Sequence, residues 1–402
     1  MKNFEIKHQS VFDKWSIEDN SVQSIITSPP YWGLRKYAIP DIIIGGDKNC
    51  EHEFVEHFTP PKGGKSHPDR PSNVGANRVM SDMDIRGVGI KSNFCILCSA
   101  WKGQYGLEPS YKDYIKHTLL WTKEAYRVLK EDGVFFLNIG DSYSSHKDCK
   151  QVAQSVSIGK PSEQACILEK GDSPSRNSRQ LKEDGMRNKC KMLIPHRIAI
   201  ALIDSGWTLR NDLIWHKPNG MPESVSDRFS KKFEYIFMFV KNEKYYFDLD
   251  SIREQWDEAS IARLYRGNSG DNKYGGEDYG GNQPSNTMSR RRPNRTKEYK
   301  TQDPERKINI KGKNPGDVWT VNTQPSTEKH FAMWPEKLVE RMIRCSTKTG
   351  DAVLDPFAGS GTTLRVAERL NRVGYGIDLG YQDIQSRRLN EIQKELTFES
   401  AS

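Results

Sequence analysis

Short apolar runs are the most regular feature of this chain, and they predict its strands. The run Val22–Thr27 is rich in β-branched residues, which is the pattern of a strand buried on both faces of a parallel sheet. Further runs predict strands at 4–7, 134–139, 209–215, 233–240, 245–248 and 373–377, and one that starts at Val353, with 233–240 and 245–248 forming a hairpin.

Apolar residues at near-helical spacing predict the helices. The longest covers 109–130 and should end at Asp132-Gly133. Others are expected at 192–204, 336–345 and 362–370, with a single helical turn at 11–15.

Two polar stretches interrupt this alternation. Residues 41–101 are rich in glycine, proline, asparagine and charge, and they are too many for an ordinary connection within a compact domain. We therefore interpret them as a functional insertion. Residues 144–190 are rich in serine, lysine and glutamine, and they indicate a mobile loop or, alternatively, disorder.

Composition changes this picture only modestly. The 402 residues exceed one average domain, so a catalytic domain with appendages is expected. A net charge of +8 is compatible with a polyanionic partner. Because no apolar leader or membrane-length run is present, we expect no membrane association and a cytoplasmic protein. Seven cysteines indicate reduced thiols or metal ligands.

The strand Val22–Thr27 ends in Ser28-Pro29-Pro30-Tyr31, and this tetrapeptide predicts a binding site. The prolines stop the strand and fix the backbone, which leaves carbonyls free to accept hydrogen bonds. A hydroxyl, a fixed carbonyl and an aromatic face suit the exocyclic amino group of a nucleobase. A simple Pro-Pro turn is the structural alternative.

A glycine-rich turn, Asp355–Thr363, follows the strand that starts at Val353. Gly359 and Gly361 permit close approach of a ligand, and the next helix offers unpaired N–H groups. No lysine follows the glycines, so a nucleoside triphosphate site is disfavoured. Asp378 ends the next strand, where an acidic side chain can accept ribose hydroxyls.

Cysteine and histidine at the two ends of the 41–101 insertion indicate a metal site. Cys95-Ile96-Leu97-Cys98 presents two thiolates to one tetrahedral ion, and Cys50 and His52 can complete the ligand set. We expect a structural zinc ion. Unrelated cysteines in a polar loop remain the alternative.

Together, the tetrapeptide and the glycine-rich turn resemble the β class of S-adenosylmethionine-dependent DNA amino-methyltransferases, most closely the cytosine-N4-specific members. The resemblance implies a circularly permuted α/β fold: a Rossmann-like, seven-stranded methyltransferase sheet with an antiparallel hairpin, polar insertions and a small recognition region. It implies that Ser28, Pro29, Pro30 and Tyr31 are catalytic, and that S-adenosylmethionine binds Asp355, Pro356, Phe357, Gly359, Ser360, Gly361, Thr362, Thr363 and Asp378.

The resemblance also implies that the enzyme methylates a flipped base in double-stranded DNA. We favour the N4 amino group of cytosine, with N6 of adenine as the main alternative and RNA or protein as further ones. Relatives often carry Trp-x-Lys-Pro-Asn in the base pocket, which here makes Trp215, Lys217 and Asn219 candidates, although a simple core position is the stronger interpretation for Trp215. Asp141 is a candidate to contact the base or to support a residue that does, and a solvent-facing loop position is the alternative.

The recognition region is expected at 251–317. Residues 251–315 hold 14 lysine and arginine residues against 9 aspartate and glutamate residues, so they suit DNA phosphates and guanine edges. A charged disordered linker is the alternative. The candidate DNA contacts are Arg263, Arg266, Arg290, Arg291, Arg292 and Arg295.

These expectations divide the chain into five segments. The catalytic domain comprises 1–40, 102–250 with its mobile loop 144–190, and the cofactor-binding part 318–402; the insertion 41–101 and the recognition region 251–317 interrupt it. The enzyme would associate with the nucleoid, and a cognate restriction endonuclease is a possible partner. The recognition sequence and the oligomeric state stay open.

Overall fold

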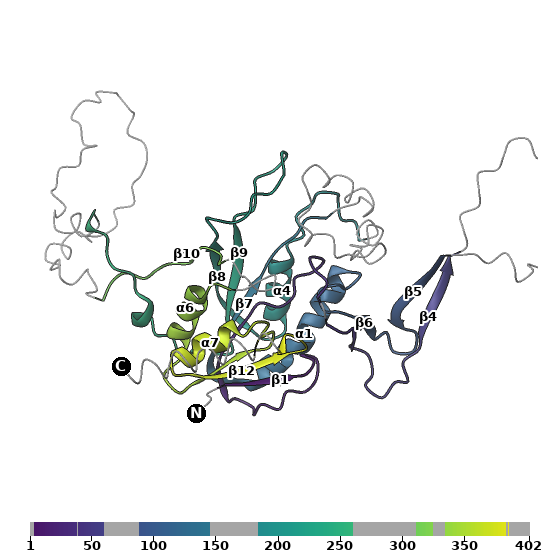
Figure 1. Ribbon diagram of the computed structural model, residues 1–402, viewed down its shortest axis with the longest axis horizontal. Coiled ribbons are helices and arrows are strands. Elements are labelled where there is room, and N and C mark those ends of the chain that lie inside the picture. The colour runs from purple at the N-terminus through teal and green to yellow at the C-terminus, as the bar shows by residue number, and fades with distance from the viewer. Residues whose placement is uncertain are drawn as a thin grey trace, which may run out of the picture.

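One mixed sheet of eight strands carries the described part of the chain. The computed structural model describes residues 4–37, 39–59, 88–144, 184–259, 311–324, 334–382 and 385. The strand order is β1-β12-β11-β2-β7-β9-β8-β10 (Figure 1). The strands are β1 Phe4–His8, β2 Val22–Thr27, β7 Leu129–Ile139, β8 Thr208–His216, β9 Phe233–Val240, β10 Val318–Thr320, β11 Ala352–Asp355 and β12 Val373–Asp378.

All strands of this sheet run in one direction except β9, which is antiparallel to both β7 and β8. The expected sheet had seven strands. The eighth is β10, which pairs in parallel with β8 and was too short to be recognised from the sequence. The predicted α/β fold is therefore confirmed with one more strand.

Helices cover both faces of the sheet. The helices α1, Tyr111–Val128, and α4, Ile194–Asp204, pack against each other on one face. On the other face lie α6, Glu336–Ser346, and α7, Thr362–Arg369, with a short 3-10 helix at Asp250–Ile252 next to α6 (Figure 1).

Strand β2 shows why the sheet needs both layers. Its six residues are all buried, as its continuous apolar pattern predicts. Ile25 belongs to the core on the α1 side, whereas Ile26 belongs to the core on the α6 side, because successive side chains point to opposite faces.

Local chemistry defines the start of α1. The side chain of Ser110 accepts a hydrogen bond from the backbone N–H of Lys112 at 3.0 Å, which caps the helix. Tyr114, Trp121 and Ala125 then face the core at helical spacing and are fully buried.

The insertion forms a small second sheet. Its antiparallel order is β3-β6-β5-β4, with β3 Ile42–Ile44, β6 Trp101–Gly103, β5 Val88–Cys95 and β4 Phe54–Thr59. The composition of 41–101 predicted an insertion but no strands. Trp101 and Ile44, which join the main core, anchor this sheet to the catalytic domain.

Three predicted elements were wrong in detail. Residues 245–248 form no strand; the hairpin partner of β9 is β8, and residues 217–232 connect the two. Asp132-Gly133 does not end a helix but lies inside β7, because α1 stops at Val128 and β7 begins at once. Residues 11–15 form turns rather than a helical turn.

No helix among the described residues is both long and apolar enough to cross a membrane.

The central position of β2 generates a stability prediction. Ile25→Ala removes a fully buried side chain and should lower the free energy of unfolding by about 2–5 kcal/mol. Ile200→Ala is the matched control, since Ile200 on α4 is 58% exposed and its loss should cost less than about 0.5 kcal/mol. Urea unfolding followed by circular dichroism measures both. Equal midpoints for the two variants would contradict the burial of β2.

Candidate active site

The candidate site lies at a topological switch point, where strands are added to the sheet on opposite sides of two neighbouring strands. After β11 the chain adds β12 on one side, whereas after β2 it adds β7 on the other, so β2 and β11 are neighbours at a switch point. Open α/β sheets bind ligands in the crevice beyond the carboxyl ends of such strands. Here Thr27 ends β2 and Asp355 ends β11, and their side chains meet there.

A cavity of about 440 Å³ opens at this edge. All eight strands contribute lining residues. Seven contribute at or just beyond their carboxyl ends, and β9 contributes at its start because it runs in the opposite direction. All four predicted catalytic residues line it. So do the predicted cofactor residues apart from Gly361, namely Asp355, Pro356, Phe357, Gly359, Ser360, Thr362, Thr363 and Asp378.

Asp355 holds the two motifs together. One of its carboxylate oxygens accepts the hydroxyl of Thr27 at 2.7 Å and the N–H of Phe357 at 3.0 Å, and the other accepts the hydroxyl of Thr363 at 2.7 Å. Burial raises the pKa of Asp355 to about 6, although these three donors oppose the rise. The carboxylate thus fixes both the turn and the end of β2.

Glycine is required in the turn itself. Gly359 and Gly361 have φ values of 51° and 78°, in the left-handed region that side chains disfavour. Gly361 is also the residue before the first turn of α7, so it shapes the turn although it does not line the cavity.

Asp378 closes the far side of the turn. Its two carboxylate oxygens accept the N–H groups of Gly359 at 2.6 Å and Gly380 at 2.8 Å. Burial raises its pKa to about 6, and the carboxyl of Asp355 adds to the rise. Lone pairs of both oxygens remain for a ligand, as each carboxylate oxygen has two.

Asn138, at the end of β7, organises the hydroxyl groups of the tetrapeptide. Its side-chain oxygen accepts from Ser28 at 3.1 Å and lies 2.7 Å from the hydroxyl of Tyr31, while its side-chain N–H donates to the carbonyl of Tyr235 at 2.9 Å. The bond to Tyr235 fixes which end of the amide faces Ser28. The hydroxyls of Ser28 and Tyr31 also lie 3.2 Å apart, and either can donate to the other. When Ser28 donates to Asn138, its oxygen lone pairs are left to accept from a ligand or from Tyr31.

Glu234, at the start of β9, is the second organiser. It lies 2.8 Å from the hydroxyl of Tyr31 and forms an ion pair with Lys217. Burial opposes ionisation, but Lys217 lowers the pKa of Glu234 below its usual value. Burial and Glu234 raise the pKa of Tyr31 well above its usual value, so Tyr31 stays a neutral hydrogen-bond donor.

The ring of Tyr31 has a close neighbour on one side. A Cβ added at Gly140 would lie 2.6 Å from the ring, so only glycine fits there. Besides the aromatic surface that was predicted for it, Tyr31 has a polar contact, because its hydroxyl lies within hydrogen-bond distance of Asn138 and Glu234.

Contacts from behind brace the tetrapeptide. The hydroxyl of Tyr114 on α1 donates to the carbonyl of Pro30 at 2.8 Å, and the indole N–H of Trp32 donates to the carbonyl of Glu108 at 2.9 Å. Gly106 approaches so closely that an added Cβ would lie 3.0 Å from Pro30. The Pro-Pro turn is therefore a fixed part of the wall.

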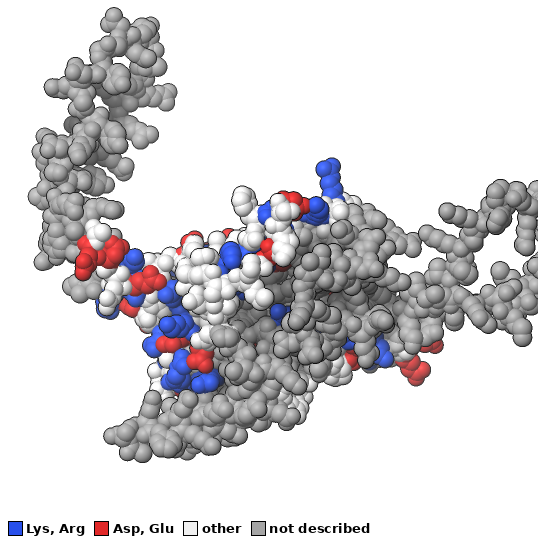
Figure 2. Space-filling model, turned by 45° about the horizontal axis from the view of Figure 1, so that its top comes forward, with Lys and Arg blue, Asp and Glu red and all other residues white. Residues whose placement is uncertain are grey.

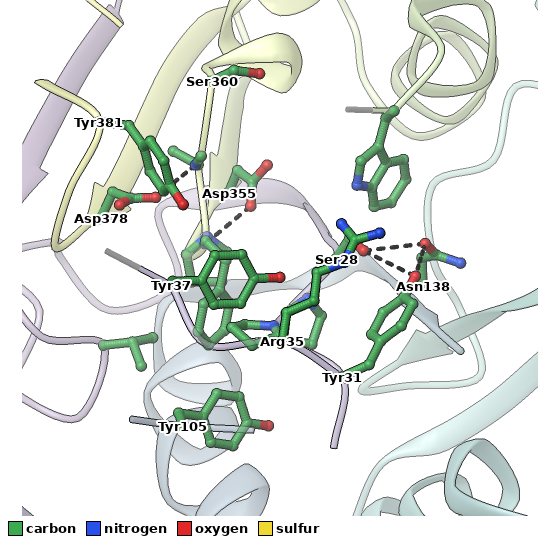
Figure 3. A pocket seen from close by; sticks show the side chains of 18 of the residues that line it. Ser28, Tyr31, Arg35, Tyr37, Tyr105, Asn138, Asp355, Ser360, Asp378 and Tyr381 are labelled. Atoms are coloured by element: carbon green, nitrogen blue, oxygen red, sulfur yellow. Dashed lines mark hydrogen bonds between the residues drawn. The ribbon is translucent and has the colours of Figure 1, made fainter. Parts of the chain in front are cut away.

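The side chains divide the cavity into two halves (Figure 3). Ser28, Tyr31 and Asn138 cluster on one side, and Asp355, Asp378, Ser360 and Tyr381 on the other, with Arg35 between them. We call these the amino half and the turn half.

Several lining residues escaped the sequence reasoning. Asn138 and Glu234 are polar residues inside apolar strand patterns, and that interruption was the available signal. Lys231, Arg35, Tyr37 and Tyr381 lie on connections without a recognisable motif.

Of the three base-pocket candidates Trp215, Lys217 and Asn219, two line the cavity and one does not. Trp215 and Lys217 line the cavity, whereas Asn219 bonds instead to the backbone of Thr323. Asp141 does not line the cavity and is buried rather than facing solvent. One oxygen of its side chain accepts the N–H of Ile194, the first residue of α4, at 3.1 Å, and its backbone carbonyl accepts from the ammonium group of Lys231, which does line the cavity.

The predicted metal ligands come together at the small second sheet. The ligand atoms of Cys50, His52, Cys95 and Cys98 all lie within 4.8 Å of one another. An added Cβ at Gly46 would lie 2.7 Å from the sulfur of Cys98, so glycine is needed for the first segment to reach the Cys95–Cys98 turn. Burial raises and backbone N–H groups lower the pKa of Cys95, with a net fall to about 6, which favours a thiolate.

The six arginines proposed to contact DNA, from Arg263 to Arg295, lie outside the described residues, as does most of the 144–190 loop.

Comparison with known proteins agrees with this site. Residues 22–386 match a family of DNA methylases, the N6/N4 methyltransferases. The type II methyltransferase M.Cfr9I of Citrobacter freundii is 29% identical over 381 residues, which cover 93% of this chain and 83% of the relative. M.SmaI of Serratia marcescens, also a type II methyltransferase, is 32% identical over 295 residues, covering 71% of this chain and 77% of that protein.

Among solved structures, PvuII DNA methyltransferase (cytosine-N4-specific) aligns with a TM-score of 0.48 and 15% identity, covering 97% of this chain and 91% of its own. The assignment rests on the sequence matches, which span both motifs and most of the chain. The chain belongs to the N6/N4 family of DNA methyltransferases.

Proposed function

We propose that this protein transfers the methyl group of S-adenosylmethionine to the N4 amino group of a cytosine flipped out of double-stranded DNA. The observation that carries the proposal is the fixed amide of Asn138, which takes the proton of Ser28 and leaves the serine oxygen as an acceptor. An oriented acceptor is what an exocyclic amino group requires from its site.

The chemistry follows from the target amine. Its lone pair is delocalised into the ring, so the nitrogen is a weak nucleophile. Hydrogen bonds from its two N–H groups to Ser28 and to the carbonyl of Pro29 favour a pyramidal nitrogen with its lone pair directed at the donor methyl group. The rest of the catalysis is positioning.

The amino half favours cytosine over adenine. Ser28 is a neutral acceptor, and Lys217 and Lys231 line the same cavity, with their ammonium groups bonded to Glu234 and to the carbonyl of Asp141. Cytosine carries a second acceptor, its O2 carbonyl, where adenine has a C–H group, so a lysine can pair with cytosine there. Adenine N6 remains the alternative, because its amino group has the same two donors.

The turn half suits the cofactor. S-adenosylmethionine supplies an activated methyl group on a cationic sulfur. Asp378 can accept from the ribose hydroxyls, and the buried carboxylate of Asp355 favours a cationic ligand. Tyr37 and Tyr381 offer aromatic surfaces beside Asp378, and burial raises the pKa of both phenols, so they stay neutral (Figure 3).

The Cys50, His52, Cys95 and Cys98 cluster fits a structural zinc ion. Three thiols and one imidazole at this spacing are a complete tetrahedral ligand set. The ion would join the 46–52 segment to the turn after β5, which is the role of a staple rather than of a catalyst.

The recognition region belongs to the same proposal. The basic segment 251–317, with Arg263, Arg266, Arg290, Arg291, Arg292 and Arg295, would contact DNA phosphates and base edges. A cognate restriction endonuclease would be the functional partner, since the relatives named above are type II methyltransferases.

The target base is tested by its product. DNA incubated with the enzyme and tritiated cofactor should yield N4-methylcytosine after digestion to nucleosides and mass spectrometry. Ser28→Ala should lower turnover by about 10²–10³ with nearly unchanged cofactor affinity, because one oriented hydrogen bond to the reacting amine is lost.

Ser205→Ala is the control for that variant, since Ser205 follows α4 away from the cavity. N6-methyladenine as the only product would overturn the choice of base and leave the role of Ser28 standing. Label in RNA or protein alone would overturn the proposed substrate.

The buried carboxyls predict a pH dependence of cofactor binding. Both pKa values are raised to about 6, so each group holds its proton below that pH, and a cationic ligand with donor hydroxyls favours the ionised forms. Affinity measured by calorimetry should be constant above about pH 7 and fall below pH 6, by up to about tenfold per pH unit for each group that must ionise. Asp378→Asn should weaken binding at pH 8 and reduce the slope; an unchanged slope would contradict the assignment.

The metal proposal predicts about one zinc per chain, read by mass spectrometry of protein prepared without chelator. Cys95→Ser should release it, because one thiolate of the tetrahedral set is lost. Cys190→Ser, at an exposed cysteine outside the cluster, should retain it. Wild-type protein without any transition metal would defeat the proposal.

A further inference from the structure

An apolar side chain stands in solvent at the rim of the cavity. Residues 217–232, which we call the β8–β9 connection, rise above the carboxyl edge of the sheet (Figure 1). Phe229 on this connection is 97% exposed and Met221 is 89% exposed, the two most exposed large apolar side chains among the described residues. A single exposed apolar side chain is common on protein surfaces, so the argument for a partner rests on where Phe229 lies and on the charge around it.

The connection is braced rather than loose. Hydrogen bonds join the two ends of the connection. The N–H of Lys217 donates to the carbonyl of Lys232 at 2.8 Å, and the ammonium group of Lys232 donates to the carbonyl of Gly220 at 2.9 Å. Glu223 forms an ion pair with Arg228 and accepts the N–H of Lys231 at 3.2 Å. These bonds surround Phe229 on both sides in the sequence.

The same connection is fixed to the segment that follows β7. The ammonium group of Lys231 donates to the carbonyl of Asp141 at 3.0 Å, and the guanidinium of Arg228 lies 4.0 Å from the ring centre of Tyr143. Lys231 and Glu234 line the cavity, and Phe229 is two residues from the first of them. Two residues span at most about 7 Å, so the Cα of Phe229 lies within about 7 Å of the Cα of a residue that lines the cavity.

The charge around Phe229 suits a polyanion. Lys217, Arg228, Lys231 and Lys232 outnumber Glu223 and Asp227 on the connection. Glu223 is paired with Arg228, Asp227 with Lys189, and Lys217 with Glu234 of the cavity. Lys231 and Lys232 are therefore the cations of the connection whose charge no carboxylate on it offsets; their ammonium groups donate to backbone carbonyls. Figure 2 shows lysine and arginine side chains at the outer end of this projection, with acidic ones beside them.

We propose that Phe229 is the wedge that enters the DNA stack and occupies the space left by the flipped target base. This inference rests on the proposed function, because it needs a duplex substrate and a flipped base. Apolar side chains that enter between base steps lower the cost of unstacking, and an aromatic ring replaces the lost stacking surface. A rigid mount makes the ring available without ordering a loop at the moment of binding.

The test uses the full-length enzyme and a duplex that carries the site mapped from wild-type methylation. Phe229→Ala should lower kcat/KM on the paired duplex by about tenfold to a hundredfold, as expected for loss of one stacking partner. On a duplex with an abasic site opposite the target, the loss should shrink to less than about threefold, because the target there is already weakly held. Cofactor affinity should not change, and Phe229→Tyr, which keeps the aromatic ring, should retain most of the activity.

Ile200→Ala is the matched control for removal of an exposed apolar side chain elsewhere. Equal rates for wild type and Phe229→Ala on the paired duplex would overturn the wedge, and so would an equal loss on both duplexes, which would mark a general binding contact. If only Met221→Ala, and not Phe229→Ala, lowered kcat/KM on the paired duplex more than on the abasic one, the choice of Phe229 would be overturned. If the wild-type enzyme methylates no site in DNA at the mapping stage, the proposed function itself is refuted rather than the wedge.

Discussion

The hydrogen bond from Thr27 to the buried carboxylate of Asp355 is the contact on which the site depends. The two residues are 328 positions apart in the chain, yet they end neighbouring parallel strands. The carboxylate of Asp355 also accepts hydrogen bonds from Phe357 and Thr363. One buried group therefore sets the position of β2, the glycine-rich turn and the start of α7. A buried carboxylate without these donors would lower the stability of the fold, so the Asp355 side chain favours the one arrangement in which all three donors reach it.

Polar groups at the sheet edge then set what the cavity can do. Asn138 and Glu234 are rigidly placed because each lies in a paired strand, Asn138 opposite Ile236 of β9 and Glu234 opposite Trp215 of β8. Their oxygens accept from the hydroxyls of Ser28 and Tyr31, and these bonds orient the oxygen of Ser28, which has lone pairs to accept from a ligand. The lysines beside Glu234 keep its negative charge compensated, so the amino half combines fixed acceptors with available donors.

The structure also joins features that look separate along the chain. The β8–β9 connection brings Lys217 and Lys231 to the cavity and carries Phe229 outside it, so a single braced segment belongs to both the pocket and the surface. The small second sheet behaves similarly. It positions Cys95 and Cys98 against Cys50 and His52, and it anchors itself in the main core through Trp101.

The sequence by itself determined the strands with continuous apolar patterns, such as β2 and β12, and the two motifs, because these depend on local backbone and burial rules. Residue type and spacing also identified the four candidate metal ligands, although the small second sheet is what brings them together. Only the tertiary structure decided that β8 rather than 245–248 pairs with β9, that β10 adds an eighth strand, and that Asp141 caps α4 while Asn138 contacts Ser28. Those outcomes depend on which strands become neighbours and on side-chain contacts about 100 positions apart in the sequence, such as Ser28 with Asn138, and no local pattern encodes that choice.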